Sequence, residues 1–274
     1  MVYDGSPMTT FTQRYGPWAL VAGASEGIGA AFARALADRG LDLVLVARRP
    51  EPLAALADAL PVRTVTVAAD LATPAGLAAV DAATAELEVG LVVANAAYAP
   101  SGLFVDADLA DLGRVVDLNC GALVHLAHRY LPPMASRRRG GLIVMSSASG
   151  MQGNPLLSTY AASKAFGAVL AEGLWWELRG SGVDVTTCVA GAVSTPGLTR
   201  ASRREAPGTV TPAAVAEAAL AGLGHGPRVV PGALMRFSTA VMARLAPRKS
   251  AIDLMARATK RVLSAGDDNG RPTP

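Results

Sequence analysis

"WALVAGASEGIG", residues 18–29, joins an apolar strand to a helix through three glycines. Its first five residues are apolar without alternation, which is typical of a strand that is covered on both faces. Glycine at 23, 27 and 29 lets the backbone turn sharply, and the helix that follows presents free N–H groups to an anion. The spacing Gly-x-x-x-Gly-x-Gly behind a first strand therefore favours a dinucleotide phosphate site over an ordinary tight turn.

The same order of apolar strand and alanine-rich helix continues along the chain. Connections of this length between strands predict a parallel sheet with right-handed crossovers. We therefore predict an α/β fold, a single doubly wound Rossmann-type domain with a seven-stranded parallel sheet and helices on both faces. The expected strands are 18–23, 41–48, 62–70, 91–97, 141–147, 183–191 and 228–232, and the expected helices are 27–39, 51–59, 74–87, 108–134, 158–179 and 212–222.

Composition limits the class and the compartment of the protein. The chain has 274 residues and 51% hydrophobic content, yet no apolar run approaches the ~20 residues of a membrane span. Its first 15 residues lack the apolar region of a secretory signal. Cys120 and Cys188 lie in apolar segments without a metal or redox spacing, which favours free thiols in a reducing cytoplasm. The net charge of +3 is too small to indicate nucleic-acid binding.

The end of the second strand indicates which dinucleotide is bound. An NAD site usually has an acidic residue ~20 positions after the glycines, where it binds the ribose 2′-hydroxyl. This chain instead reads "VARRP", with Ala47, Arg48 and Arg49. Guanidinium groups suit a 2′-phosphate through charge-assisted hydrogen bonds, whereas two solvated arginines at a strand end are the alternative. We therefore predict NADP(H) as the cofactor, ahead of NAD(H).

A serine, a tyrosine and a lysine form a candidate catalytic set. Tyr160 and Lys164 are four residues apart in "YAASK", so they share one face of a helix. Ser147 ends the fifth strand, and ligands of open parallel sheets bind beyond the carboxyl ends of the strands. A nearby ammonium favours the phenolate and lowers the tyrosine pKa toward working pH. Helix packing for the tyrosine and a solvated face for the lysine are the weaker alternatives.

At this point the chain resembles the short-chain dehydrogenase/reductase family, over residues 16–232. The start of the chain, "MTTFTQRYGPWALVAGAS" from Met8, is similar to the branch with long-chain ketoacyl and hydroxysteroid reductases, which implies a lipophilic substrate. The segments that carry the family resemblance follow one another in order: "GASEGIG" at 23–29, "DL" at 70–71, "NAA" at 95–97, "LNCG" at 118–121, "SSASG" at 146–150, "YAASK" at 160–164 and "AGAVSTP" at 190–196.

The resemblance implies a role for each matching residue. Ser147 would orient the substrate carbonyl, Tyr160 would transfer the proton, and Lys164 would bind the nicotinamide ribose and lower the tyrosine pKa. Asn119 would hold a water that links the lysine to solvent. The implied cofactor contacts are Gly23, Ser25, Gly27, Ile28, Gly29, Arg48, Arg49, Asp70, Leu71, Asn95, Ala96, Tyr160, Lys164, Val193 and Thr195, and the candidate substrate contacts are Tyr98, Ser149 and Leu198.

The C-terminal part differs in charge from the rest of the chain. Residues 228–263 contain eight Arg or Lys and one acid, a net of +7, whereas the remainder has 17 basic and 21 acidic residues, a net of −4. Apolar residues recur there at near-helical spacing. We expect this basic segment to pack over the substrate cleft or a subunit partner, with contact to a membrane surface as the alternative.

These observations give one domain plan. We expect a flexible N-terminus at 1–12, an NADP-binding catalytic domain at 13–232 with a substrate lid near 196–210, a basic amphipathic extension at 233–264 and a disordered tail at 265–274.

The predicted function is NADP(H)-dependent interconversion of a ketone and a secondary alcohol. The lipophilic substrate would be acyl, steroid-like or polyketide-like, and the family resemblance implies a homodimer or homotetramer. A non-catalytic NADP-sensing or binding protein is the alternative, although such members usually lose the tyrosine or the lysine.

Overall fold

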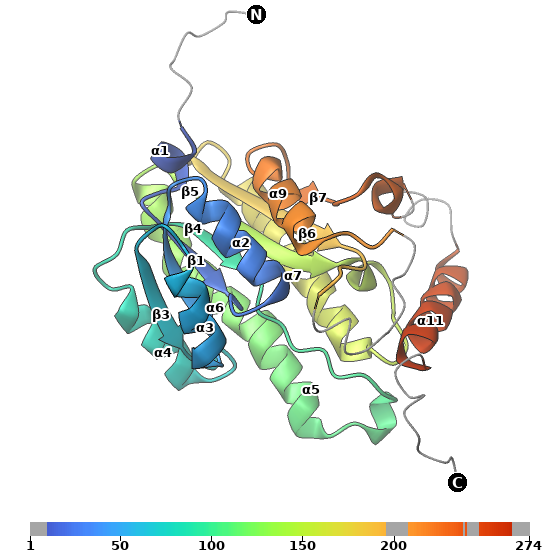
Figure 1. Cartoon of the computed structure of the whole chain (residues 1–274). Helices are drawn as coiled ribbons and strands as arrows, with labels where there is room; N and C mark the ends of the chain where they lie inside the picture. The colour runs from blue at the N-terminus through green and yellow to red at the C-terminus, as the bar shows by residue number, and fades with distance from the viewer. Residues whose placement is uncertain (1–9, 196–207, 238, 240–246, 265–274) are drawn as a thin grey trace, which may run out of the picture.

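The computed structural model describes residues 10–195, 208–237, 239 and 247–264. It contains one parallel seven-stranded sheet in the order β3-β2-β1-β4-β5-β6-β7, with helices on both sides (Figure 1). This confirms the predicted fold class. The strands are β1 (Trp18–Ala22), β2 (Asp42–Ala47), β3 (Thr64–Ala68), β4 (Val89–Ala94), β5 (Gly140–Ser147), β6 (Val183–Ala190) and β7 (Arg228–Val229).

The helices follow the predicted order, and several begin at residues suited to a helix start. The described α-helices are α1 (Phe11–Tyr15), α2 (Gly27–Ala37), α3 (Pro50–Asp58), α4 (Pro74–Ala83), α5 (Leu109–Val116), α6 (Ala122–Ser136), α7 (Ser158–Glu177), α9 (Pro212–Gly222) and α11 (Arg248–Ser264). Proline opens α3, α4 and α9, where its missing N–H costs nothing. The hydroxyls of Thr73 and Thr211 cap α4 and α9 by accepting backbone N–H bonds.

Each face of the sheet is covered by its own set of helices. Alternate strand residues point to opposite faces, so Val21 belongs to one core and Leu20 to the other. Helices α2, α3 and α9 cover the first face, where Phe32 is fully buried. Helices α4, α6 and α7 cover the second, with Leu126 in its centre. Both faces of the central strands are therefore dry, as their uninterrupted apolar runs predict.

The strand order reverses between β1 and β4. From β1 the chain adds β2 and β3 on one side, and β4 then pairs with the other side of β1. Loops that leave these two strands diverge, and the crevice between them is where doubly wound sheets bind ligands. The side-chain amide of Asn95, directly after β4, donates to the carbonyl oxygens of Ala22 and Gly23 at the end of β1, at 3.2 and 3.1 Å. Asn95 thus links the end of β4 to the end of β1 at the base of the crevice.

Two predictions about the elements need correction. The helix expected over 108–134 is interrupted, because residues 117–121 form a π-helical turn between α5 and α6. The last strand is shorter than expected, ending at Val229. Residues 196–207 of the lid expected near 196–210, and both chain ends, 1–9 and 265–274, lie outside the described residues.

The C-terminal extension contributes helix α11, at the end of the molecule opposite β3 and α4 (Figure 1). Among the described helices, none has the length and apolar character needed to cross a membrane. Cys120 and Cys188 are both free thiols, as expected.

Candidate active site

The glycine loop leaves room for a ligand because side chains are excluded from it. Gly23 has a φ of +78°, and a Cβ there would lie 2.9 Å from the Cα atom of Ala96. A Cβ on Gly29 would lie 1.9 Å from the carbonyl oxygen of Gly23. Helix α2 can therefore start against the end of β1 only with glycine at these positions. The loop before α2 lines a pocket, and the free backbone N–H groups at the start of a helix suit a pyrophosphate.

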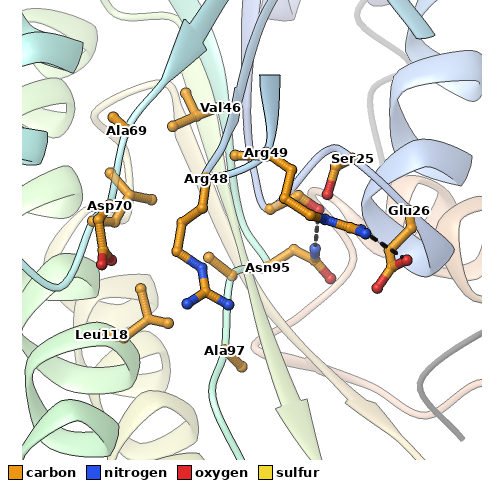
Figure 2. Close-up of a pocket in the computed structure, with 14 residues that line it drawn as sticks. Ser25, Glu26, Val46, Arg48, Arg49, Ala69, Asp70, Asn95, Ala97 and Leu118 are labelled. Atoms are coloured by element: carbon orange, nitrogen blue, oxygen red, sulfur yellow. Dashed lines mark hydrogen bonds and ion pairs between the residues drawn. The ribbon is translucent and has the colours of Figure 1, made fainter. Parts of the chain in front are cut away.

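A pocket of about 540 Å³ opens beside this loop (Figure 2). It collects most of the predicted cofactor residues from the loops after β1, β2, β3 and β4. Arg48 extends into the pocket, whereas Arg49 turns toward Glu26 and forms an ion pair with it at 2.9 Å (Figure 2). The lining residues are Gly23, Ser25, Glu26, Val46, Ala47, Arg48, Arg49, Ala69, Asp70, Leu71, Asn95, Ala96, Ala97 and Leu118.

Asp70 is held in place at the far wall of this pocket. Its carboxylate accepts a hydrogen bond from Arg114 of α5 at 2.7 Å and one from the backbone N–H of Ala72 at 3.1 Å. Partial burial by itself raises the pKa of the Asp70 carboxyl group, but these two hydrogen bonds, together with the charges of Arg114 and Arg48, lower the pKa below its usual value. Asp70 is therefore an ionised acceptor that points into the pocket next to Leu118 (Figure 2).

The candidate catalytic residues lie together, beyond the carboxyl end of β5. Ser147 is the last residue of β5, and Tyr160 lies on the first turn of α7, close enough for the Ser147 hydroxyl to act on the pKa of its phenol. The Lys164 ammonium lies 5.6 Å from the centroid of the Tyr160 ring and donates to the carbonyl oxygen of Met145 at 2.9 Å. Lys164 is only 8% exposed, so this cation is almost wholly removed from water.

The pKa relation between Tyr160 and Lys164 differs from the prediction. Desolvation raises the pKa of the Tyr160 phenol above its usual value, and the Ser147 hydrogen bond only partly opposes this. Burial lowers the pKa of Lys164 to about 8. The reason is geometric: the ammonium is engaged by a backbone carbonyl and lies beside the ring, so its charge does little for the hydroxyl. In this arrangement Tyr160 is a neutral proton donor.

Asn119 sits within the π-helical turn, and its side chain is fully engaged by protein atoms. Its amide nitrogen donates to the carbonyl oxygen of Tyr98 and to the hydroxyl of Ser163, at 3.0 and 2.9 Å. Its carbonyl oxygen accepts the backbone N–H of Tyr98 at 2.8 Å. Ser163 in turn donates to the carbonyl oxygen of Tyr160. Asn119 therefore ties the loop after β4 to the catalytic helix, and π-helical turns are frequent at such functional positions.

The candidate substrate contacts occupy different surroundings. Ser149 lies in the turn after β5, where its backbone N–H donates to the Ser147 hydroxyl at 3.2 Å. The Tyr98 hydroxyl donates to Asp111 of α5 at 2.8 Å, so this ring lies against α5. Val193 is buried and pairs with Val210, and Thr195 lies half-buried two residues further on. Leu198 lies outside the described residues.

Sequence reasoning missed Arg114 and Glu26, which hold the pocket residues Asp70 and Arg49. Arg114 could have been noticed as the residue one helical turn before Leu118. Glu26 carries a weaker signal, because a charged residue in a glycine loop is usually solvated. Both residues act through ion pairs with partners distant in sequence, which no local motif records.

The residues present fit a nicotinamide dinucleotide. The glycine loop suits the pyrophosphate, Arg48 and Asp70 line the pocket beside it, and Ser147, Tyr160 and Lys164 lie beyond the carboxyl end of β5. A hydroxyl pair beside a buried cation can bind a carbonyl oxygen and exchange a proton with it. The arrangement therefore suits transfer of a hydride and a proton at a carbon–oxygen bond.

Comparisons with known proteins agree with this chemistry. A 7beta-hydroxysteroid dehydrogenase from Clostridium sardiniense is 35% identical over 192 residues, which cover 68% of this chain and 73% of the relative. A very-long-chain 3-oxoacyl-CoA reductase-like protein from Arabidopsis thaliana is 32% identical over 230 residues, which cover 80% of this chain and 74% of the relative.

A solved structure and a family profile support the same assignment. The structure of a short-chain dehydrogenase from Sphingobium yanoikuyae in complex with NADPH is 33% identical, with a TM-score of 0.73 over 85% of this chain and 97% of that one. The profile of the short chain dehydrogenase family matches residues 17–206. By its fold, its site and these matches, the chain belongs to the short-chain dehydrogenase family, whose members are oxidoreductases that use nicotinamide cofactors.

Proposed function

We propose that this protein is an NADP(H)-dependent oxidoreductase that interconverts a ketone and a secondary alcohol on a lipophilic substrate. The observation that carries the proposal is the grouping of Ser147, Tyr160 and Lys164 beyond β5, at the same ends of the parallel strands as the pocket beside the glycine loop. The alternative, a sensor that binds the dinucleotide without turnover, does not require these three residues together.

Each side chain has a distinct role in this proposal. The Ser147 hydroxyl donates to the substrate carbonyl oxygen and holds it near the Tyr160 phenol, which delivers the proton during reduction. Lys164 lies beside the Tyr160 ring and donates to the ribose of the bound cofactor. The bound nicotinamide supplies or accepts the hydride. In the reverse direction Tyr160 accepts the proton of the alcohol.

We assign Asn119 to a proton path on the inner side of Lys164. A cavity of about 20 Å³ borders Asn119, Ser163 and Lys164. This volume suits one water molecule, and the polar side chains on its wall provide hydrogen-bond partners. Because the Asn119 amide is already bonded to protein, that water would be held by the lysine and by backbone groups.

The preference for NADP(H) rests on Arg48. Its guanidinium extends into the pocket, whereas Arg49 is engaged by Glu26 (Figure 2). A 2′-phosphate on the adenosine ribose would meet the Arg48 charge directly, and no carboxylate stands at Ala47 to favour a 2′-hydroxyl. The solved relative from Sphingobium yanoikuyae, crystallised with NADPH, supports the same choice.

A lipophilic substrate is supported by the surface near Tyr160. A hollow of about 260 Å³ is lined by Thr159, which precedes Tyr160, by the apolar residues Leu103, Phe104, Leu112 and Leu156, and by the carboxylates Asp106, Asp108 and Asp111. Leu103 and Phe104 are 58% and 60% exposed, so they offer apolar surface within this otherwise mixed lining. The names of the two curated relatives, a hydroxysteroid dehydrogenase and a very-long-chain oxoacyl-CoA reductase, point to steroid-like or long acyl ketones.

The domain plan also belongs to this proposal. Residues 13–232 form the catalytic domain, with a lid near 196–210, and the extension at 233–264 borders the substrate side. Its residue Met235 lies directly over Gly191, the residue after β6, so closely that a Cβ on Gly191 would lie 2.1 Å from the Met235 methyl carbon. The extension therefore reaches the loop that carries Val193 and Thr195.

We further propose that the protein is a homo-oligomer, a dimer or tetramer, through α7. Phe166, Val169 and Trp176 are 41%, 67% and 65% exposed, and their spacing places them on one face of this helix. Gly173 lies in the same row, and space beyond it is open. Val169→Glu would place a charge in the centre of this row, and light scattering should then show a smaller assembly than that of the unmodified protein.

The test of the function is turnover of a panel of ketones with NADPH, followed by loss of its absorbance. The panel should contain bulky ring ketones, long-chain 3-oxoacyl thioesters and small ketones, each also tried with NADH. We expect reduction of at least one bulky substrate, with a lower KM than for the small ketones. Tight NADPH binding without any turnover, in either direction, would favour the sensor instead.

A further inference from the structure

Helix α11 lies against the loop that follows the catalytic serine. Arg248 donates to the carbonyl oxygen of Met151 at 3.1 Å. The side chain of Ile252 lies beside Gly153, since a Cβ built there would be 3.6 Å from it. Thr259 donates its hydroxyl proton to the side-chain oxygen of Asn154 at 2.8 Å. Residues 248, 252 and 259 fall on one face of a helix, so this face docks on three positions of one loop.

The bond between Thr259 and Asn154 is withdrawn from water. Asn154 is 2% exposed and Thr259 is 8% exposed. Removing one partner of a buried hydrogen bond costs more free energy than an average hydrogen bond contributes, because the group left behind is not rehydrated. This bond links residues 105 positions apart in the chain and therefore fixes the extension to the catalytic domain.

The same amide also reaches toward the catalytic serine. The Asn154 nitrogen donates to the Ser149 hydroxyl at 3.2 Å, and the backbone N–H of Ser149 donates to the Ser147 hydroxyl at 3.2 Å. Ser147 in turn lies beside Tyr160. Hydrogen bonds of Asn154 and Ser149 thus connect Thr259, on the C-terminal helix, to the Ser147 hydroxyl that is proposed to hold the substrate oxygen.

The direction of the bond at Ser147 matters for the chemistry. A hydroxyl has one proton to donate and two lone pairs with which to accept. Because the Ser147 oxygen accepts from the Ser149 N–H, this bond occupies one lone pair and does not use the serine proton. The orientation of the serine therefore depends on where the loop holds the Ser149 backbone.

We propose that Thr259 and Asn154 are positioning residues for the reaction, which fix the loop after β5 so that Ser147 presents its proton to the substrate carbonyl. The inference rests on the proposed function. In this proposal the C-terminal helix affects turnover. If Thr259 only anchored the extension, its loss would lower stability and leave catalysis unchanged.

The experiment compares two substitutions of Thr259 with one control substitution. Thr259→Val removes the hydroxyl and keeps the shape, Thr259→Ser keeps the hydroxyl, and Thr66→Val makes the same change at an exposed position of β3, the strand at the far edge of the sheet. For each variant, NADPH dissociation constants, kcat and KM for a ketone that the unmodified protein reduces, and melting temperature would be measured. If Thr259→Val folds poorly, Thr259→Ala, which admits water to Asn154, replaces it.

We expect Thr259→Val to lower kcat by about 10-fold, within the ~10² that small misplacements of reacting groups can cost. Its NADPH affinity should stay within twofold of the unmodified protein, Thr259→Ser should restore kcat, and Thr66→Val should match the unmodified protein. A lower melting temperature with unchanged kcat and KM would overturn the positioning role and leave an anchor. Failure of the unmodified protein to reduce any ketone would instead refute the proposed function, so the two failures are distinguishable.

Discussion

The proposed cofactor side and the proposed substrate side both lie beyond the carboxyl ends of the strands, but they are built in different ways. On the cofactor side, the lining residues other than Leu118 lie within a few positions of the strand that carries them, as Ser25 follows β1 and Arg48 follows β2. On the substrate side, the loop after β5 is held by Thr259, from the far end of the chain. The first side is formed mainly by turns next to the strands. The second also depends on a contact with a helix that is far away in the sequence.

This difference separates two kinds of substitution. A change on the cofactor side should alter dinucleotide binding and leave the fold and the proton chemistry intact. A change on the substrate side should leave dinucleotide binding intact and alter turnover, KM or both. The predictions below test that separation, beginning with the residue at the junction of the two sides.

Tyr160→Phe should produce the largest effect. The substitution keeps the ring and removes the proton donor, so turnover should fall by ~10²-fold or more, the scale of general acid catalysis. NADPH affinity and melting temperature should change little. The matched control is Tyr15→Phe. It removes a hydroxyl that donates to Asp184 near the start of β6, at the amino ends of the strands, and it should leave kcat unchanged. A Tyr160→Phe enzyme with near-normal kcat would mean that another group supplies the proton.

Arg48→Asp should reverse or erase the preference for NADPH. It removes one charge-assisted hydrogen bond to a 2′-phosphate, worth roughly 10- to 100-fold in the dissociation constant, and adds repulsion. NADH affinity should fall far less. Arg49→Asp is the comparison, because Arg49 is paired with Glu26, and its effect on NADPH should be smaller. Equal NADPH and NADH affinities in the unmodified protein would contradict the assignment of Arg48.

Removal of the C-terminal extension should act on the substrate side. Truncation after Pro231 removes α11 and exposes Asn154, so the melting temperature should fall. The KM for bulky lipophilic ketones should rise by about 10-fold, the value of one lost apolar side-chain contact, and that for small ketones less. Truncation after Ser264 is the control and should change neither. Salt-sensitive binding of the intact chain to anionic vesicles would assign the basic face to a membrane surface instead.

The sequence predicts the cofactor side far better than the substrate side, for a physical reason. A strand end that must turn beneath a phosphate requires glycine, and this requirement is visible within the seven residues "GASEGIG". The order of the motifs likewise predicts the sheet and the neighbourhood of Ser147 and Tyr160. The contacts of Asn154 with Thr259, and of Asp70 with Arg114, depend on how separate helices dock, and no period or spacing encodes them.

The sequence also could not predict the direction in which the Tyr160 pKa is shifted. Spacing places Lys164 on the same helix face as Tyr160, which favours a lowered tyrosine pKa. It does not reveal that the ammonium donates to the Met145 carbonyl and that burial dominates both groups. Electrostatic effects depend on distance and dielectric, and these quantities emerge only when the chain is packed.

The smallest predicted effect is a pH dependence of stability that comes from Lys164. Burial lowers its pKa from the ordinary 10.5 to about 8. Between these pH values the unfolded chain holds the proton and the folded protein does not. The contribution of this group therefore increases the free energy of unfolding as pH rises. Below about pH 8 both states are protonated, and the folded protein bears the full cost of a buried ammonium.

Lys164→Met keeps the length of the side chain and removes the titration, so the difference in unfolding free energy between the unmodified protein and this variant reports the Lys164 titration together with its coupling to the Cys120 thiol. Burial also raises the pKa of Cys188 to about 12, which lowers stability above pH 9, but both proteins share this term and it cancels. Urea denaturation at steps from pH 6 to 10 should show a difference that is flat up to about pH 7.5 and then grows in favour of the unmodified protein. Lys249→Met, at an exposed lysine, should show no such slope. A pH-independent difference for Lys164→Met would mean that the ammonium is not desolvated, and the neutral-donor arrangement at Tyr160 would lose its electrostatic basis.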